Sequence, residues 1–153
     1  MLFRSDLPRR APRPQRPLRH AVAFWLERDD GRVLFVRRPD RGILGGTAAP
    51  PVSAWRDSPW PKAESVRAAP VQAEWQPLPG VVRHGFTHFR VEMRVLAARV
   101  AGGPDGLWQP ESALRQGRWP TLTRKLVAHA LAAAAATAAA AAVADQPISE
   151  RTR

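Results

Sequence analysis

The stretch RHAVAFWLERDDGRVLFV, residues 19–36, decides the fold that the sequence predicts. Six consecutive apolar residues, 21–26, indicate a strand that is buried on both faces. The segment Asp29-Asp30-Gly31 predicts a tight turn, because glycine accepts the positive φ that such turns require. Residues 33–36 form a second apolar run. The stretch is therefore predicted to form a β-hairpin that other elements cover on each face.

Outside the hairpin, the pattern changes several times. Residues 89–97 alternate apolar and charged side chains, which is typical of a half-buried strand. Glycine and proline between residues 39 and 80 predict irregular structure, with a helix in part of residues 62–75. Near the C-terminus we expect a short strand at 107–109, a short helix at 110–116 and a long helix that Thr121 or Thr123 caps. Strands and helices mixed in this order predict the α+β class.

Composition limits the function. The chain has 153 residues, sufficient for one domain with a core, and no cysteine, which excludes disulfides, thiol catalysis and cysteine-held metal within it. Its 24 basic residues exceed its 13 acidic ones, and all but Lys62 and Lys125 of the basic residues are arginine. The net charge of +11 points to a polyanion partner such as nucleic acid. Abundant arginine, alanine and proline are also typical of proteins encoded by genomes rich in G and C, which is an alternative explanation of the high arginine content.

The predicted domain, residues 18–131, has a tail at each end. Residues 1–17 hold four prolines and five arginines and predict an extended linker, either a basic arm that contacts phosphates or a simple tether. Residues 132–153 are predicted to be an alanine-rich helix end and a polar tail. The run 126–144 is long enough to span a bilayer, but its alanines and His129 favour a soluble helix, and we expect no membrane partner.

No motif in the chain predicts catalysis or metal binding. His84 and His88 are four residues apart, which along a strand separates them by about 13 Å. The serines lack a nucleophile elbow, and no phosphate-binding glycine loop is followed by lysine. We therefore predict no catalytic residue and no metal ligand.

The hairpin and the segment RRPDRGILGG, residues 37–46, resemble the opening of a Nudix domain. Hydrolases of that family hold a divalent metal with a glutamate-rich helix. Here Pro51 and Val52 stand where that helix needs a glutamate, six residues beyond the two glycines. The acids that follow are Asp57, Glu64 and Glu74, none adjacent to another. The resemblance implies a Nudix-like mixed β-sheet flanked by helices, with a C-terminal alanine-rich helix and without the metal cluster.

A longer likeness extends from about Arg16 to Leu131. The segments RPLRHAVAFWLERDDGRVLFVRRPDRGILGG, RHGFTHFRVEMRVLAARV, GLWQPESAL and WPTLTRKLVAHAL follow one another as in the C-terminal domain of A/G-specific adenine DNA glycosylases of the MutY type, which they resemble. In that family an aromatic–hydroxyl–histidine loop reaches 8-oxoguanine opposite adenine. The matching residues are Phe86, Thr87 and His88. The resemblance implies a bacterial, cytoplasmic, nucleoid-associated protein of base-excision repair that binds duplex DNA containing 8-oxoguanine:adenine.

Thr87 suits this lesion chemically. In 8-oxoguanine, N7 becomes a donor and C8 carries an acceptor oxygen, and one hydroxyl both accepts and donates. The family often has serine at this position, so the extra methyl of Thr87 leaves less space between the side chain and the base. Phe86 is expected to wedge or pack beside the bases, His88 to bond a phosphate or brace the loop, and Gly85 to allow a sharp turn. Alternatively, Phe86 and Phe89 are core residues and Thr87 is a strand residue.

The resemblance also implies what lies outside this domain. In the family a separate helical domain excises adenine and carries a cysteine-bound iron–sulfur cluster. Residues 1–17 cannot contain it, so we expect the chain to be a recognition half that holds no cofactor, is inactive alone, and works with a separate glycosylase domain. The candidates for contact with the DNA backbone are Arg37, Arg38, Arg41 and Arg83.

Two other functions stay open. One is a divergent nucleotide diphosphate hydrolase that uses Asp57, Glu64 or Glu74. The other is a sequence-blind nucleic-acid or protein-interaction module, whose polyanion surface would include Arg37, Arg38 and Arg41. The first predicts magnesium-dependent phosphate release, and the second predicts indifference to loss of the Thr87 hydroxyl.

Overall fold

The computed structural model describes residues 16–39 and 45–144. Within them a mixed sheet and three helices confirm the predicted α+β, Nudix-like architecture. Residues 1–15 of the predicted linker and residues 145–153 of the predicted tail lie outside the described residues. The elements in chain order are β1 (Leu18–Arg28), β2 (Val33–Arg37), β3 (Ala48–Ala49), α1 (Lys62–Arg67), β4 (Gln76–Pro77), β5 (Val82–Gly85), β6 (Arg90–Val100), β7 (Leu107–Gln109), α2 (Glu111–Gln116) and α3 (Thr121–Ala144).

The β1–β2 hairpin forms as predicted. The two strands pair antiparallel, with Glu27 opposite Val33. Gly31 has a φ of 88° in the turn, and its amide donates to the carbonyl oxygen of Arg28 at 2.8 Å. The Asp30 carboxylate accepts hydrogen bonds of 3.0 and 2.7 Å from the Arg28 guanidinium. Local residues therefore close this turn, and β6 supports it, because the Asp29 amide donates to the carbonyl oxygen of Val100 at 3.0 Å.

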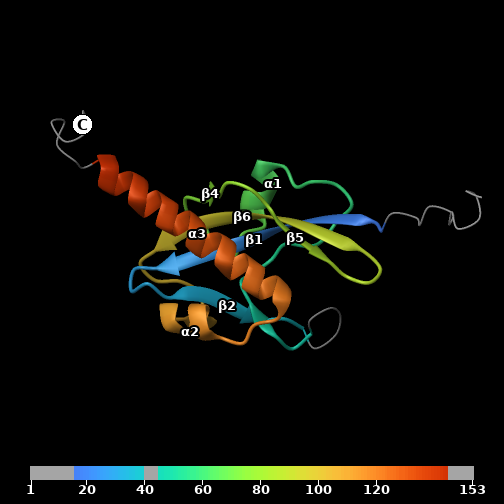
Figure 1. Ribbon diagram of the computed structural model, residues 1–153, viewed down its shortest axis with the longest axis horizontal. Helices are drawn as coiled ribbons and strands as arrows, with labels where there is room; N and C mark the ends of the chain where they lie inside the picture. The colour runs from blue at the N-terminus through green and yellow to red at the C-terminus, as the bar shows by residue number, and fades with distance from the viewer. Residues whose placement is uncertain (1–15, 40–44, 145–153) are drawn as a thin grey trace, which may run out of the picture.

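The centre of the sheet is a parallel pair, β1 and β6. Their register runs from Leu18 opposite Arg90 to Arg28 opposite Val100. The strand order is β3-β2-β1-β6-β4, with β5 on β6 and β7 on β2, and every pairing other than β1–β6 is antiparallel (Figure 1). This register places the start of β1 beside the start of β6, at the end of the sheet where the β5–β6 connection lies.

Alternate side chains of β1 enter two cores, one on each face of the sheet. The set that begins with Ala21 packs with buried residues of α2 and α3. The set that begins with Val22 packs with Trp75 and the segment that follows α1. Figure 1 shows α3 crossing one face of the sheet. The prediction that both faces of the hairpin are covered is therefore confirmed.

The helices differ from the predictions at their ends. α1 is short and ends at Arg67, with Ala68 as its C-cap, before Pro70. α3 begins at Thr121, and the amide of Arg124 donates to the carbonyl oxygen of Pro120 at 2.9 Å, which places Pro120 at the N-cap position. Thr123 is only 1% exposed. The predicted threonine cap is wrong, because the helix begins earlier and Thr123 belongs to its buried face. Among the described residues, no helix combines the length and hydropathy needed to cross a membrane.

Candidate nucleic-acid interface

The β5–β6 hairpin carries the predicted lesion-recognition residues at its tip. Its register pairs Gly85 with Arg90, and the amide of Phe86 donates to the carbonyl oxygen of Phe89 at 2.7 Å. Thr87 and His88 therefore form the two-residue connection, and both are exposed. Within the described residues the Thr87 hydroxyl has no hydrogen-bond partner. The alternative in which Thr87 is a strand residue is wrong, since β5 ends at Gly85 and β6 begins only at Arg90.

Aromatic rings support the tip from below. Phe86 and Phe89 stack with ring centroids 4.9 Å apart, and both lie against Trp55, at 5.9 and 5.6 Å. The His84 ring meets Phe86 edge-on at 4.7 Å. Phe86 is half-buried and packs against the core. The hairpin thus presents a rigid aromatic base with two exposed polar side chains beyond it, while contact of Phe86 or His88 with DNA stays a prediction.

Gly85 has a different role from the predicted one. It lies in β5, outside the set of glycines with left-handed φ, so the sharp turn belongs to Thr87 and His88 instead. A Cβ at Gly85 would lie 3.3 Å from Nη1 of Arg16. That Nη1 donates to the carbonyl oxygen of Phe86. The missing side chain therefore makes room for an arginine that holds the hairpin.

Beside this arginine lies a small pocket of about 220 Å³ behind the hairpin tip. The amide of Arg90 donates to the carbonyl oxygen of Pro17 at 2.8 Å, and its guanidinium donates to the carbonyl oxygen of Arg16 at 3.4 Å. The Arg83 side chain is 76% exposed and pairs with Glu92 at 3.1 Å. The start of β1, the β5–β6 hairpin and α3 all contribute to the pocket, which is lined by Arg16, Leu18, Arg83, His84, Gly85, Arg90, Val91, Glu92 and Lys125.

Lys125 ties α3 to this pocket. Its Nζ donates to the carbonyl oxygen of Arg83 at 2.9 Å and lies 3.2 Å from Nδ1 of His84. Burial and, second, the Lys125 charge lower the pKa of His84 below its ordinary 6.5. At neutral pH His84 is therefore uncharged, with Nδ1 accepting from Lys125 and the proton on Nε2.

Of the predicted backbone-binding arginines that the structure describes, only Arg83 lies at the pocket. Arg83 lines the pocket, whereas Arg37 donates to the carbonyl oxygen of Gly46 at 2.8 Å. Arg38 is half-buried, which lowers its pKa, and its guanidinium lies 6.0 Å from the Trp55 ring centroid, beneath the hairpin. Arg41 lies outside the described residues. Sequence analysis missed Arg16, Arg90 and Lys125, because only the β1–β6 register and the docking of α3 bring them together.

The three candidate acids for hydrolysis are dispersed or engaged. Glu64 on α1 accepts a hydrogen bond from Arg56 at 2.8 Å. Asp57 has an 88% exposed side chain and lies 3.6 Å from Arg19. Among the described residues, no three histidines or carboxylates lie close enough to hold a metal ion together. This donor set does not fit a magnesium cluster, which needs several oxygen ligands around one point.

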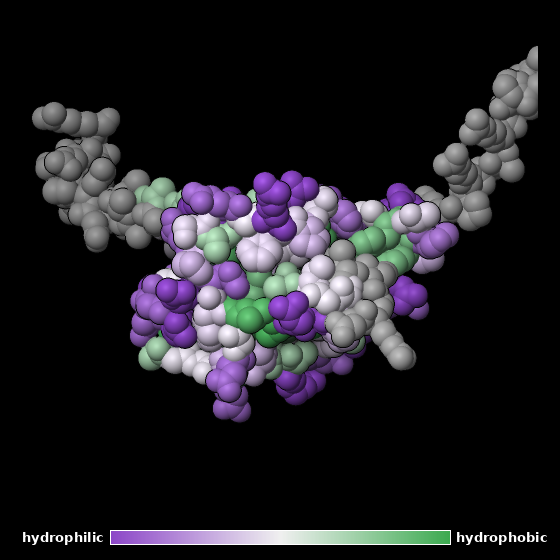
Figure 2. Space-filling view, turned by 90° about the horizontal axis from the view of Figure 1, so that it is seen from below, coloured by the Kyte–Doolittle hydropathy of each residue, from purple (hydrophilic) through white to green (hydrophobic). Residues whose placement is uncertain are grey.

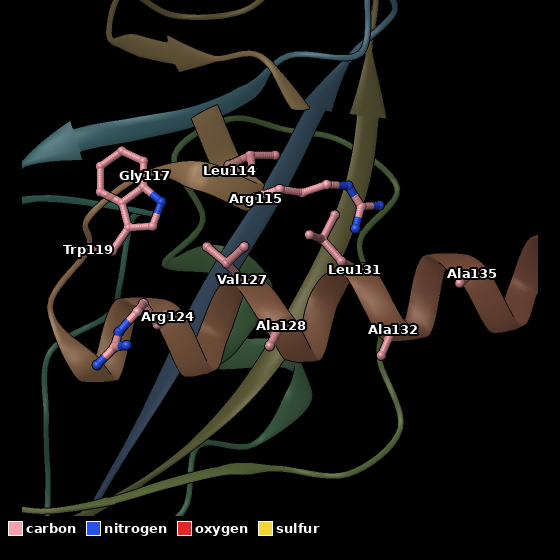
Figure 3. A pocket seen from close by; sticks show the side chains of 10 residues that line it. All are labelled: Leu114, Arg115, Gly117, Trp119, Arg124, Val127, Ala128, Leu131, Ala132 and Ala135. Atoms are coloured by element: carbon pink, nitrogen blue, oxygen red, sulfur yellow. The ribbon is translucent and has the colours of Figure 1, made fainter. Parts of the chain in front are cut away.

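A larger pocket, of about 500 Å³, lies elsewhere, between α2 and α3. Leu114, Trp119 and Val127 are directed into this space, Arg124 lies on the Trp119 side of it, and Arg115 lies near Leu131 (Figure 3). Its lining offers no carboxylate, imidazole, hydroxyl or thiol, so it holds no acid, base or nucleophile for catalysis. Seen from below, hydrophobic side chains gather in the middle of the molecule and hydrophilic ones surround them (Figure 2).

Taken together, the fold and site define a mixed-sheet α+β domain with a basic pocket behind an exposed hairpin tip, and without clustered carboxylates among its described residues. Residues 22–129 match the NUDIX domain family. The chain belongs to that family.

Solved structures that share this fold belong to proteins that are named for different activities. The C-terminal domain of mouse MUTYH, in complex with human PCNA, is 20% identical, with a TM-score of 0.55 over 72% of this chain and 86% of that one. The MutT protein of Methanosarcina mazei is 15% identical, with a TM-score of 0.54 over 74% and 92%. The MutT NUDIX hydrolase of Burkholderia pseudomallei is 20% identical, with a TM-score of 0.53 over 73% and 97%. No curated protein matches the chain significantly. At these identities the likeness shows the fold alone.

Proposed function

We propose that this NUDIX domain binds duplex DNA and distinguishes 8-oxoguanine from guanine opposite adenine, as the recognition domain of an adenine DNA glycosylase. The observation that carries the proposal is the exposed tip of the β5–β6 hairpin, where the Thr87 hydroxyl has no partner among the described residues. The likeness of the fold to the C-terminal domain of mouse MUTYH supports it. So do the basic side chains directly behind the tip.

Rigidity of the tip suits discrimination between two similar bases. Phe86 and Phe89 pair across the hairpin and stack on each other, so the Thr87 backbone has a defined position. From that position the hydroxyl can donate to the C8 oxygen and accept from N7–H of 8-oxoguanine. Guanine has no oxygen at C8, and its N7 only accepts. The expected difference is about 1–3 kcal/mol, or roughly ten- to hundredfold in affinity.

Titration of duplexes tests the proposal. Fluorescence anisotropy with matched 8-oxoguanine:adenine and guanine:adenine duplexes is expected to show tighter binding of the lesion, with affinity that falls steeply as salt rises. Equal affinities at every salt concentration would contradict lesion recognition. No release of adenine from either duplex is expected from this chain alone, because the proposal assigns excision to the helical domain of the glycosylase family.

Nucleotide hydrolysis is the second candidate, favoured by the MutT and hydrolase structures that share this fold. Its difficulty is the donor set, because Glu64 is engaged by Arg56 and no carboxylate cluster exists among the described residues. Phosphate or pyrophosphate release from nucleoside di- and triphosphates with magnesium is the assay. Turnover that Glu64→Gln abolishes would replace the DNA-binding proposal with this one.

A further inference from the structure

We infer that the pocket behind the β5–β6 hairpin holds one backbone phosphate of the DNA strand that carries the recognised base. The inference rests on the proposed DNA binding and adds a defined contact to it. Arg16, Arg83, Arg90 and Lys125 line the pocket with a single carboxylate, Glu92. That carboxylate already pairs with Arg83 at 3.1 Å, so the pocket retains an excess of three positive charges.

Donors in the pocket remain available to an anion. Lys125 uses two contacts, to the Arg83 carbonyl oxygen and to Nδ1 of His84, and an ammonium has three protons. Arg16 uses Nη1 to hold the Phe86 carbonyl oxygen, and its other N–H groups have no hydrogen-bond partner within residues 16–39 and 45–144. Because Nδ1 of neutral His84 accepts from Lys125, its Nε2 carries a further proton. The pocket is thus a concave set of hydrogen-bond donors, as a phosphate oxyanion requires.

Size favours a phosphate group over a whole nucleotide. Sites for small molecules usually enclose roughly 300–1,000 Å³. This pocket encloses about 220 Å³, and the one aromatic ring in its lining, that of His84, already packs edge-on against Phe86. A phosphate that is part of a longer strand needs only this volume, since the sugar and base on either side stay outside.

The pocket lies close to Thr87, the residue proposed to recognise the base. Gly85 lines the pocket, and Thr87 follows it by two residues, so the two Cα atoms are at most about 7 Å apart. B-DNA carries one phosphate per about 3.4 Å of axis on each strand. A strand that presents a base to Thr87 therefore has a phosphate within reach of Arg16 and Lys125.

The test measures affinity and its salt dependence for Lys125→Gln and Arg16→Gln in the full chain. The matched control is Arg32→Gln, which removes one charge at the β1–β2 turn, roughly 33 Å along β1 from the hairpin end. Each pocket variant is expected to weaken binding of both duplexes about tenfold and to lower the salt slope by about one. Lys125→Gln should weaken the 8-oxoguanine:adenine and guanine:adenine duplexes equally, whereas Arg16→Gln should also lower lesion preference, because it releases the Phe86 carbonyl oxygen. Lys125→Arg is expected to retain most of the affinity. Thermal unfolding confirms that each variant is folded.

The outcomes separate this inference from the proposed function. Pocket variants that weaken binding no more than Arg32→Gln, in a protein that still prefers the lesion, would overturn the phosphate site and leave lesion recognition intact. Equal weakening on all duplexes, in a protein without lesion preference, would support the site and remove the proposed function. Inorganic phosphate and ADP form the second arm. Binding of either that Lys125→Gln abolishes, with DNA affinity unchanged, would overturn the assignment to DNA.

Discussion

The guanidinium of Arg16 donates a hydrogen bond to the backbone carbonyl oxygen of Phe86, 70 residues further along the chain. Arg16 lies two residues before the first strand, and Phe86 immediately precedes the hairpin tip. The guanidinium occupies the space that the absent side chain of Gly85 leaves open. The segment that leads into the sheet and the loop that carries Thr87 are therefore one connected unit.

Removal of this guanidinium is expected to loosen the tip. Arg16→Ala loses a charge-assisted hydrogen bond, and we expect a loss of about 1 kcal/mol in unfolding free energy together with faster amide exchange at residues 86–89. Hydrogen exchange and urea unfolding measure the two effects. Arg19→Ala is the control, since Arg19 makes only an exposed 3.6 Å ion pair with Asp57. Unchanged protection of the tip in Arg16→Ala would show that the aromatic stack alone holds it.

The Thr87 hydroxyl is expected to determine lesion preference without affecting stability. Thr87→Val removes the hydroxyl at nearly constant volume, and we expect the ratio of affinities for lesion and undamaged duplexes to fall roughly ten- to hundredfold. Thr87→Ser keeps the hydroxyl and is expected to keep the ratio. Thr137→Val, which removes an exposed hydroxyl from α3, serves as the control in the same anisotropy assay. Preference that survives in Thr87→Val would place recognition at another residue.

Stability is expected to depend on pH through His84. Its pKa in the folded protein is lowered from 6.5, first by burial and then by Lys125. Between the lowered value and 6.5 the unfolded chain binds more protons, so this contribution is complete above 6.5 and is lost as pH falls through the folded pKa. Urea unfolding from pH 5 to 8 measures it as the difference between the wild type and His84→Gln. A His84→Gln curve parallel to that of the wild type would refute the assignment to His84.

The core on the face opposite α3 is expected to be essential to the fold. Phe24 is 1% exposed and meets Trp75 edge-on, with ring centroids 5.3 Å apart. Phe24→Ala leaves a cavity between β1 and the irregular segment and should cost about 3–5 kcal/mol of unfolding free energy. Val66→Ala, at an exposed position on α1, is expected to change it by less than about 0.5 kcal/mol. Denaturant unfolding gives both values, and similar losses in the two variants would contradict this account.

Local sequence patterns predicted those strands and turns whose structure is determined by their own residues. The β1–β2 hairpin formed where six apolar residues precede a glycine turn, and β6 buries Val91, Met93 and Val95 as its alternation predicts. Alternation predicted only one buried face, yet Leu96 is buried on the other, because the segment after α1 covers that side too. The parallel β1–β6 pair had no local signal, since it joins strands that are far apart in the chain.

The candidate site also combines features that the sequence predicted with features that depend on residues far apart in the chain. Placement of Thr87 and His88 at an exposed loop followed from a resemblance in sequence, and the described hairpin agrees with it. The role of Gly85 was predicted wrongly, because its neighbour in space is Arg16 and not the turn. Lys125 could not be assigned to the site from sequence, since its helix reaches β5 only in the folded domain.

The attachment of the incoming chain has a mechanical consequence. Arg16 holds the Phe86 carbonyl oxygen, and Arg90 holds the carbonyl oxygens of Arg16 and Pro17. Tension applied at residue 16 is therefore transmitted to the base of the Thr87 loop, because hydrogen bonds and not a flexible connection join the two segments. Anything that displaces this end of the chain by an ångström or two also displaces the hydroxyl, so the reading position and the direction of entry into the domain are mechanically coupled.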